Sequence, residues 1–110
     1  MTKPDFVELI VTCGSWQEAQ DIADSLLEKR LVACVEFIDI KSKYHWQGAI
    51  EEASEVKLIM ESVATRFEAI ELEIAKLHSY KTFVLQQLPI NRLSRRATEW
   101  LTAELKEKNR

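Results

Sequence analysis

The segment from Arg30 to Ser62 constrains the fold more than any other part of the sequence. Two runs rich in β-branched and aromatic residues, residues 31–40 and 56–60, flank a polar stretch with one glycine and no proline. This pattern is typical of a β-hairpin, and its arms of about fourteen residues exceed the roughly 3–10 residues of most strands. A domain of 110 residues is too small to cover such arms. We therefore expect the outer end, with Tyr44 and Trp46, to need a partner subunit.

The composition predicts one ordered globular domain over residues 1–110. Hydrophobic residues make up 46% of the chain, and its two glycines and two prolines argue against disorder. A core of this size needs no metal or disulfide to fold. The net charge of -3 argues against a nucleic-acid partner, and no apolar stretch approaches the roughly 18 residues of a membrane span. We expect neither nucleic acid nor membrane as a partner.

The start of the chain and its cysteines predict the compartment. Residues 1–5 lead straight into a strand-like run, without the long apolar segment and cleavage site of a signal peptide. Cys13 and Cys34 are well separated and form no CxxC motif. We therefore expect a cytoplasmic protein with two free thiols.

Hydrophobic periodicity places the first elements. Residues 6–13 are expected to form a strand buried on both faces, and Ser15 with Glu18 forms a capping box that opens a helix. Because crossovers are right-handed, the strand that begins near Val32 should lie parallel to the first. The return arm of the hairpin then fills the gap between them.

The rest of the chain continues this alternation. Thr65 with Glu68 is expected to open a second helix, and residues 83–88 to form a fourth strand. A third helix should begin near Ser94 and turn Trp100 inward. The order β-α-β-β-α-β-α is the α+β, ferredoxin-like split βαβ pattern with a long hairpin and an added C-terminal helix. Fold alone assigns no function.

Two motifs in the hairpin segment are specific by length and order. RLVACV at residues 30–35 and YHWQGAIEEASEV at residues 44–56 are close to the patterns RLAACV and YWWxGKIExxxEV. On these motifs, with weaker support from His78, Tyr80 and LPI at residues 88–90, the chain resembles the CutA divalent-cation tolerance proteins. That family is similar in fold to the PII nitrogen regulators. The resemblance implies a cytoplasmic homotrimer, with hairpins wrapped around neighbours and intersubunit pockets for copper or similar divalent ions.

His78 and Cys34 are the candidate metal ligands. Imidazole at a helix end is a common transition-metal ligand, although His78 could instead cap the helix. The soft sulfur of Cys34 suits copper, although free cysteine is more often a small core residue. The family's HPYExP motif stands here as HSYKTF at residues 78–83, without both prolines and the glutamate. A carboxylate ligand is thereby replaced by an ammonium group that cannot coordinate a cation.

The expected intersubunit surface holds Tyr44, Trp46, Glu61, Tyr80 and Lys81. Tyr44 and Trp46 share one face of their strand, and rigid aromatic side chains favour interfaces. Glu61 stands where the family usually has lysine, and Lys81 where it usually has glutamate. We expect a reversed ion pair between them, and strand order requires that it cross a subunit boundary.

The sequence carries no catalytic pattern. It has neither a glycine-rich phosphate loop nor a Gly-x-Ser-x-Gly motif, and we expect Glu51, Glu52 and Glu55 to form a solvated rim. We therefore expect no enzymatic activity. Two functions stay open: a homotrimer for divalent-metal (copper) tolerance with intersubunit ion sites, or a trimeric PII-like signalling scaffold that binds a small anion or a protein without metal.

Overall fold

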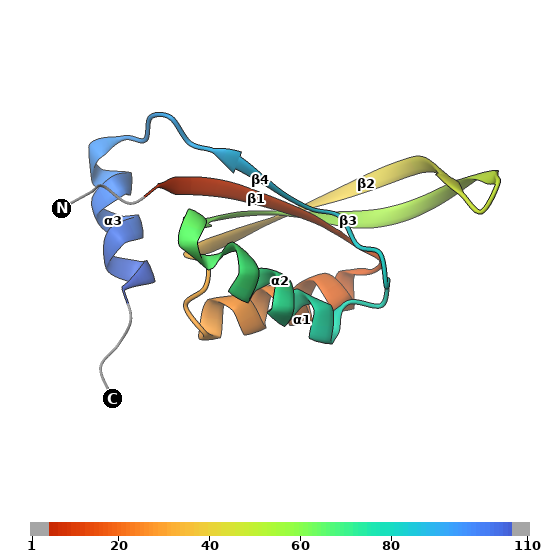
Figure 1. The fold of residues 1–110 in the computed structure, drawn as a ribbon, viewed down its shortest axis with the longest axis horizontal. Coiled ribbons are helices and arrows are strands. Elements are labelled where there is room, and N and C mark those ends of the chain that lie inside the picture. The colour runs from red at the N-terminus through yellow and green to blue at the C-terminus, as the bar shows by residue number, and fades with distance from the viewer. Residues whose placement is uncertain (1–4, 107–110) are drawn as a thin grey trace.

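The computed structural model describes residues 5–106, which form a four-stranded antiparallel sheet with helices on one face (Figure 1). The strands are β1 (Phe6–Cys13), β2 (Cys34–Trp46), β3 (Ala49–Val63) and β4 (Leu85–Pro89). The helices are α1 (Trp16–Glu28), α2 (Phe67–Leu77), α3 (Arg95–Leu105) and a short 3-10 turn, η1 (Ala64–Arg66). The predicted ferredoxin-like α+β fold is confirmed. The sequence predicts no signal peptide in residues 1–5, and residues 1–4 of that segment lie outside the described range.

The strand order β2-β3-β1-β4 is that of a split βαβ unit. β3 pairs antiparallel with both β1 and β2, so β1 and β2 are parallel with β3 between them, as predicted. Cys13 lies opposite Val56 and Cys34 opposite Glu61, which places the two cysteines at opposite ends of the sheet. β2 and β4 are the two edges of the sheet among the described residues.

The core fills the space between the sheet and helices α1 and α2. Its fully buried side chains include Leu9, Val11, Ile22, Leu26, Leu58, Met60, Ile70 and Ile74. The expectation that β1 is buried on both faces is wrong. Helices α1 and α2 cover one face only, and on the other face Glu8, Ile10 and Thr12 stay half-buried while α3 packs on Phe6.

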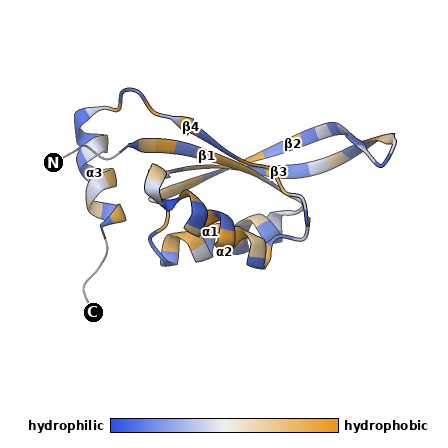
Figure 2. Ribbon diagram, viewed as in Figure 1, coloured by the Kyte–Doolittle hydropathy of each residue, from blue (hydrophilic) through white to orange (hydrophobic). Residues whose placement is uncertain are grey.

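The long hairpin is confirmed, and its outer half extends beyond the helices (Figure 1). Pairing between β2 and β3 is unbroken up to Trp46 opposite Ala49. The turn consists of Gln47 and Gly48 with φ of 50° and 82°, the values of a type I′ turn. The outer half carries mostly polar residues (Figure 2). Its apolar side chains are uncovered, and Ile50 is 70% exposed.

Helix α1 begins at the predicted cap, but the capping box closes differently. The Ser15 hydroxyl accepts a hydrogen bond from the Glu18 amide at 3.2 Å. The Glu18 carboxylate accepts from the Gly14 amide at 2.9 Å and not from that of Ser15. Glu18 therefore bonds one residue beyond the helix cap, at the end of β1.

Helix α2 starts later than predicted. Thr65 lies in the 3-10 turn η1, and α2 begins at Phe67, where the cap residue Arg66 makes no side-chain capping bond within the described chain. The Ala64 amide donates to the Asp5 carbonyl at 2.9 Å. This bond extends the pairing of β1 and β3, so the chain turns tightly before a regular helix can form.

Two arginines hold α3 against the end of α1. Arg30 follows α1 in the left-handed region, with φ of 55°. Its guanidinium donates to the carbonyl of Glu104 at 2.9 Å and to the carboxylate at 3.2 Å. The Arg66 guanidinium donates to the carbonyls of Arg30 and Leu105. Residues far apart in the chain are thereby fixed at one corner of the molecule.

The C-terminal elements differ from the prediction in two respects. β4 begins at Leu85, because Phe83 turns away to stack on His78 with ring centroids 5.1 Å apart. Trp100 does not face inward and is 45% exposed, while Leu101 is buried against Phe6. No helix within residues 5–106 is long and apolar enough to cross a membrane.

Candidate functional site

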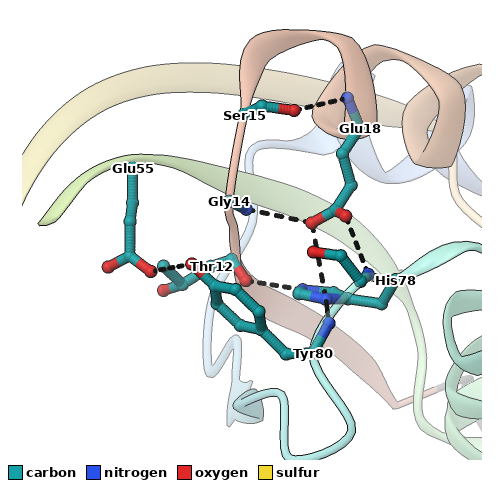
Figure 3. A network of polar contacts seen from close by, with 8 residues as sticks. Thr12, Gly14, Ser15, Glu18, Glu55, His78 and Tyr80 are labelled. Atoms are coloured by element: carbon teal, nitrogen blue, oxygen red, sulfur yellow. Dashed lines mark hydrogen bonds and ion pairs between the residues drawn. The ribbon is translucent and has the colours of Figure 1, made fainter.

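Three potential metal-ligating side chains meet at the end of β1. Figure 3 shows two of them, Glu18 and His78, with their hydrogen-bond partners. Cys13 is the last residue of β1, Glu18 lies in the first turn of α1, and His78 caps the C-terminal end of α2. One ligand atom from each lies within 4.8 Å of the other two. β3 ends beside the start of β1, and β4 begins beside the end of β1. The connecting helix α2 must therefore finish near Cys13.

His78 is the centre of this cluster, and its imidazole is fully buried. Its Nε2 lies 2.8 Å from the Thr12 carbonyl, and its Nδ1 accepts the Tyr80 amide proton at 3.0 Å. Because a carbonyl can only accept, Nε2 carries the ring proton. In the isolated subunit His78 is not accessible to an ion from solvent, since its side chain is buried and both ring nitrogens bind backbone groups.

Glu18 supplies the negative charge of the cluster. Its carboxylate accepts from the amides of Gly14 at 2.9 Å and Ser79 at 2.8 Å, and lies 3.4 Å from the Nδ1 of His78. Burial alone would raise the pKa of Glu18, but the hydrogen bonds from Gly14 and Ser79 outweigh it and hold the pKa below its ordinary value. Glu18 is therefore an ionised carboxylate facing the imidazole.

Cys13 completes the cluster as a buried thiol. Burial, and then the charges of Glu18 and Glu55, raise the pKa of Cys13 to about 12. The thiol therefore keeps its proton at neutral pH. A cation that coordinates this sulfur must displace the proton.

The donor set fits a divalent transition metal. Sulfur, nitrogen and oxygen ligands together suit zinc or copper. Ligand atoms of one zinc ion lie about 2.0–2.3 Å from the metal, and so within about 4.6 Å of one another. The three ligand atoms lie within 4.8 Å of one another, an upper bound slightly wider than this spacing. Coordination by His78 must also replace one of its two backbone hydrogen bonds.

A second buried carboxylate, Glu55, lies next to the cluster. It was expected in a solvated rim, but it is only 7% exposed, so that expectation is wrong. The Tyr80 hydroxyl donates to Glu55 at 2.6 Å (Figure 3). The Tyr80 ring packs on Gly14, where an added Cβ would lie 3.1 Å from the hydroxyl oxygen. Burial and the bond to Glu55 raise the pKa of Tyr80 above its ordinary value.

Cys34, the other predicted ligand, lies at the opposite end of the sheet. Its thiol donates to the Glu61 carboxylate at 3.2 Å. Burial, and then this bond to Glu61, raise the pKa of Cys34 to about 12. Within one subunit the structure does not bring Cys34 and His78 together.

Of the residues predicted at the intersubunit surface, Tyr44 and Trp46 are exposed on the hairpin. Glu61 pairs with Glu8 near the start of β1, whereas exposed Lys81 precedes β4 at the other end. An ion pair between Glu61 and Lys81 therefore requires two subunits, and it stays a prediction.

Sequence reasoning missed Cys13 and Glu18 as neighbours of His78. The signal was available in the strand order. In a split βαβ sheet, the end of β1, the start of α1 and the end of α2 must meet at the same end of the strands. Side chains at these three chain positions are therefore expected to cluster.

The β2-β3-β1-β4 sheet, its two crossover helices and its protruding hairpin define a ferredoxin-like split βαβ protein. Residues 7–104 match the family described as CutA1 divalent ion tolerance protein. The chain belongs to this family, as its hairpin motifs indicated.

Relatives match over nearly the whole chain. A divalent-cation tolerance protein CutA of Archaeoglobus fulgidus is 37% identical over 93 residues, covering 84% of this chain and 91% of the relative. A divalent-cation tolerance protein CutA of Pectobacterium atrosepticum is 34% identical over 103 residues, covering 93% of this chain and 94% of the relative.

Solved structures agree. The periplasmic divalent cation tolerance protein CutA of A. fulgidus superimposes with a TM-score of 0.90 at 34% identity, covering 92% of this chain and 99% of that one. CutA1 of Oryza sativa gives 0.91 at 25% identity, covering 98% and 100%.

Proposed function

We propose that this chain is a subunit of a CutA-like homotrimer that acts in divalent-cation tolerance and binds the cation directly, without catalysis. The observation that carries the proposal is the cluster of Cys13, Glu18 and His78. It places a thiol, a carboxylate and an imidazole within reach of one ion, in a chain whose relatives are named for divalent-cation tolerance. Copper and zinc are the ions that this donor set favours.

The uncovered half of the hairpin supports the homotrimer. Tyr44, Trp46 and Ile50 are 37%, 50% and 70% exposed in the single chain, an unusual arrangement for a paired strand end. Sedimentation-velocity ultracentrifugation at micromolar concentration tests this proposal. A stable monomer would contradict it.

Within the trimer we assign His78 to the ligand set together with Cys13 and Glu18. Cys34 lies at the other end of its own sheet, so it joins such a site only if a neighbouring subunit brings it there. Tyr80 and Lys81 lie two and three residues after His78 and are proposed to line the adjacent intersubunit surface, opposite Glu61 of a neighbouring subunit.

Calorimetric titration with zinc and copper tests the site. We expect saturable binding by the unmodified protein and a loss of at least about tenfold in affinity for His78→Ala, since loss of even an outer-shell partner of a ligand costs about 10–100-fold. His45→Ala is the matched control, because His45 is exposed on the hairpin and outside the cluster. Circular dichroism shows whether His78→Ala still folds, and Cys13→Ala provides a second variant of the same site.

The second candidate is a PII-like trimeric scaffold for a small anion or a protein. It is favoured by the closed hydrogen bonding of the cluster, since every buried side-chain nitrogen and oxygen among the described residues has a partner. Absence of saturable heat with either metal, in a protein that still forms trimers, would leave this candidate alone.

We also propose a cytoplasmic location, which the two free, widely separated thiols support. The A. fulgidus structure is named as that of a periplasmic protein. Cell fractionation of the producing organism, with detection by antibody, distinguishes the two compartments.

A further inference from the structure

A continuous path of contacts joins the His78 cluster to the hairpin (Figure 3). The Tyr80 amide donates to the Nδ1 of His78 at 3.0 Å, and the Tyr80 hydroxyl donates to Glu55 at 2.6 Å. One residue therefore bonds to the imidazole through its backbone and to β3 through its side chain.

Glu55 lies where the hairpin leaves its helical cover. The next residue, Val56, is buried under the helices, whereas residues 49–54 of β3 are exposed or half-buried. Glu55 is itself a buried carboxylate, and a buried acceptor is destabilised when it loses its donor. The hydrogen bond from Tyr80 therefore fixes the base of the protruding half.

The hydrogen bond from Tyr80 to Glu55 depends on which group the Nδ1 atom of His78 binds. The Nδ1 atom faces the Glu18 carboxylate at 3.4 Å, so it is the ring nitrogen placed to share a cation with Glu18. That nitrogen is already the acceptor for the Tyr80 amide. If Nδ1 held a cation, His78 could no longer accept this hydrogen bond, and the Tyr80 backbone would have to move to another acceptor.

The Tyr80 ring has little freedom to absorb such a movement. Its hydroxyl and ring edge lie against Gly14, at 3.1 and 3.3 Å from the position of an added Cβ. A shift of the backbone therefore moves the hydroxyl with it. The bond to Glu55 depends on a single oxygen at 2.6 Å, so it is lost or lengthened.

We propose that Tyr80 is a positioning residue that couples the cation site to the hairpin: it fixes the hairpin base when His78 is free and releases it when a cation occupies Nδ1. The proposal rests on the cation-binding function proposed above. It adds a means by which the occupied site changes the surface that the hairpin offers to neighbouring subunits.

Amide hydrogen exchange of the full chain, with and without zinc, tests the coupling. In the unmodified protein we expect zinc to speed exchange in residues 49–56 by about tenfold, as for loss of one charge-assisted hydrogen bond. Tyr80→Phe keeps the ring on Gly14 and removes the hydroxyl. Its exchange there should be fast without zinc and should not rise further, while its zinc heat persists.

Thr102→Val is the control, because it removes a hydroxyl that donates a hydrogen bond within α3, away from the hairpin. It should behave as the unmodified protein does. Zinc heat with unchanged exchange in residues 49–56 would overturn the coupling and leave the cation site intact. Slow exchange in metal-free Tyr80→Phe would show that Tyr80 does not fix the hairpin base. Absence of zinc heat would contradict the proposed function itself.

Discussion

The inner and outer halves of the hairpin have the same backbone pairing but different surroundings. In the inner half of β3, Val56, Leu58 and Met60 face the helices and are at most 4% exposed. In the outer half the ladder continues without a break to Ala49, yet Ile50 is 70% exposed. Backbone hydrogen bonds therefore do not distinguish the halves. The inner half is stabilised by the core of its own chain, and the outer half by its turn and, as we propose, by a neighbour.

The largest effect is expected from a cavity in the inner half. Leu58→Ala should lower the free energy of unfolding by about 3 kcal/mol, because Leu58 is fully buried against α1 and α2. Urea denaturation followed by circular dichroism measures this loss. Ile50→Ala, the same kind of truncation in the outer half, is the control. Equal losses for both variants would remove the distinction between the halves.

The outer half should respond in assembly. Trp46→Ala is expected to raise the dissociation constant of the oligomer by about tenfold or more, because exposed aromatic side chains are frequent anchors of interfaces. The unfolding free energy of the dissociated chain should change by less than about 0.5 kcal/mol. Ultracentrifugation over a concentration series measures the first quantity. An unchanged dissociation constant would show that the outer half is not an interface.

The helices that cover the inner half depend on an ionised carboxylate. Lys29 and Ser25 donate hydrogen bonds to the Glu73 carboxylate at 2.8 Å and 2.6 Å. These two bonds lower the pKa of Glu73 from 4.5 to about 2. Because the folded pKa is depressed, this stabilisation is present above pH 4.5 and is lost as pH falls towards 2.

Glu73→Gln should therefore flatten the acid side of the stability profile. The midpoint of urea denaturation, measured for both proteins between pH 7 and pH 2, gives the comparison. The unmodified protein should lose most stability below pH 4.5, the ordinary pKa of this carboxyl group. Glu71→Gln, on the exposed face of the same helix, is the control. Parallel profiles for the unmodified protein and Glu73→Gln would contradict the assignment.

The smallest effect is expected at the turn. Gln47 has a positive φ of 50°, which asparagine adopts more easily than glutamine. Gln47→Asn should stabilise the tip by about 0.5 kcal/mol or less, because asparagine relieves only part of the roughly 1–2 kcal/mol cost of a left-handed residue. Hydrogen exchange should slow near the tip while global unfolding stays unchanged. A change in global unfolding would show that the two halves unfold together.

Local patterns predicted the parts of the fold that depend on nearby residues. Alternation predicted the hairpin and the inward face of Val56, Leu58 and Met60, and handedness predicted β1 parallel to β2. The start of α2 was missed because it depends on the bond from Ala64 to Asp5, which lies at the other end of the sequence.

The candidate site was predicted less well because its contacts are long-range. The buried His78 ring makes a hydrogen bond with Thr12, 66 residues away in the sequence. The buried Glu55 carboxylate accepts one from Tyr80, 25 residues away. The sequence identified His78 and Cys34 as separate ligand candidates and did not include Cys13. The partner that topology supplies is Cys13, whose position at the end of β1 is a property of the whole sheet.

The sheet has two different edges, β2 and β4, and this restricts how copies of the chain can associate. Contact between β2 of one copy and β4 of the next is heterologous, so each copy still offers one edge of each kind. Such an association ends only when it closes into a ring, and otherwise it grows as a filament. In the proposed homotrimer, a substitution that alters the angle between neighbouring subunits is therefore expected to produce fibres and not dissociated chains.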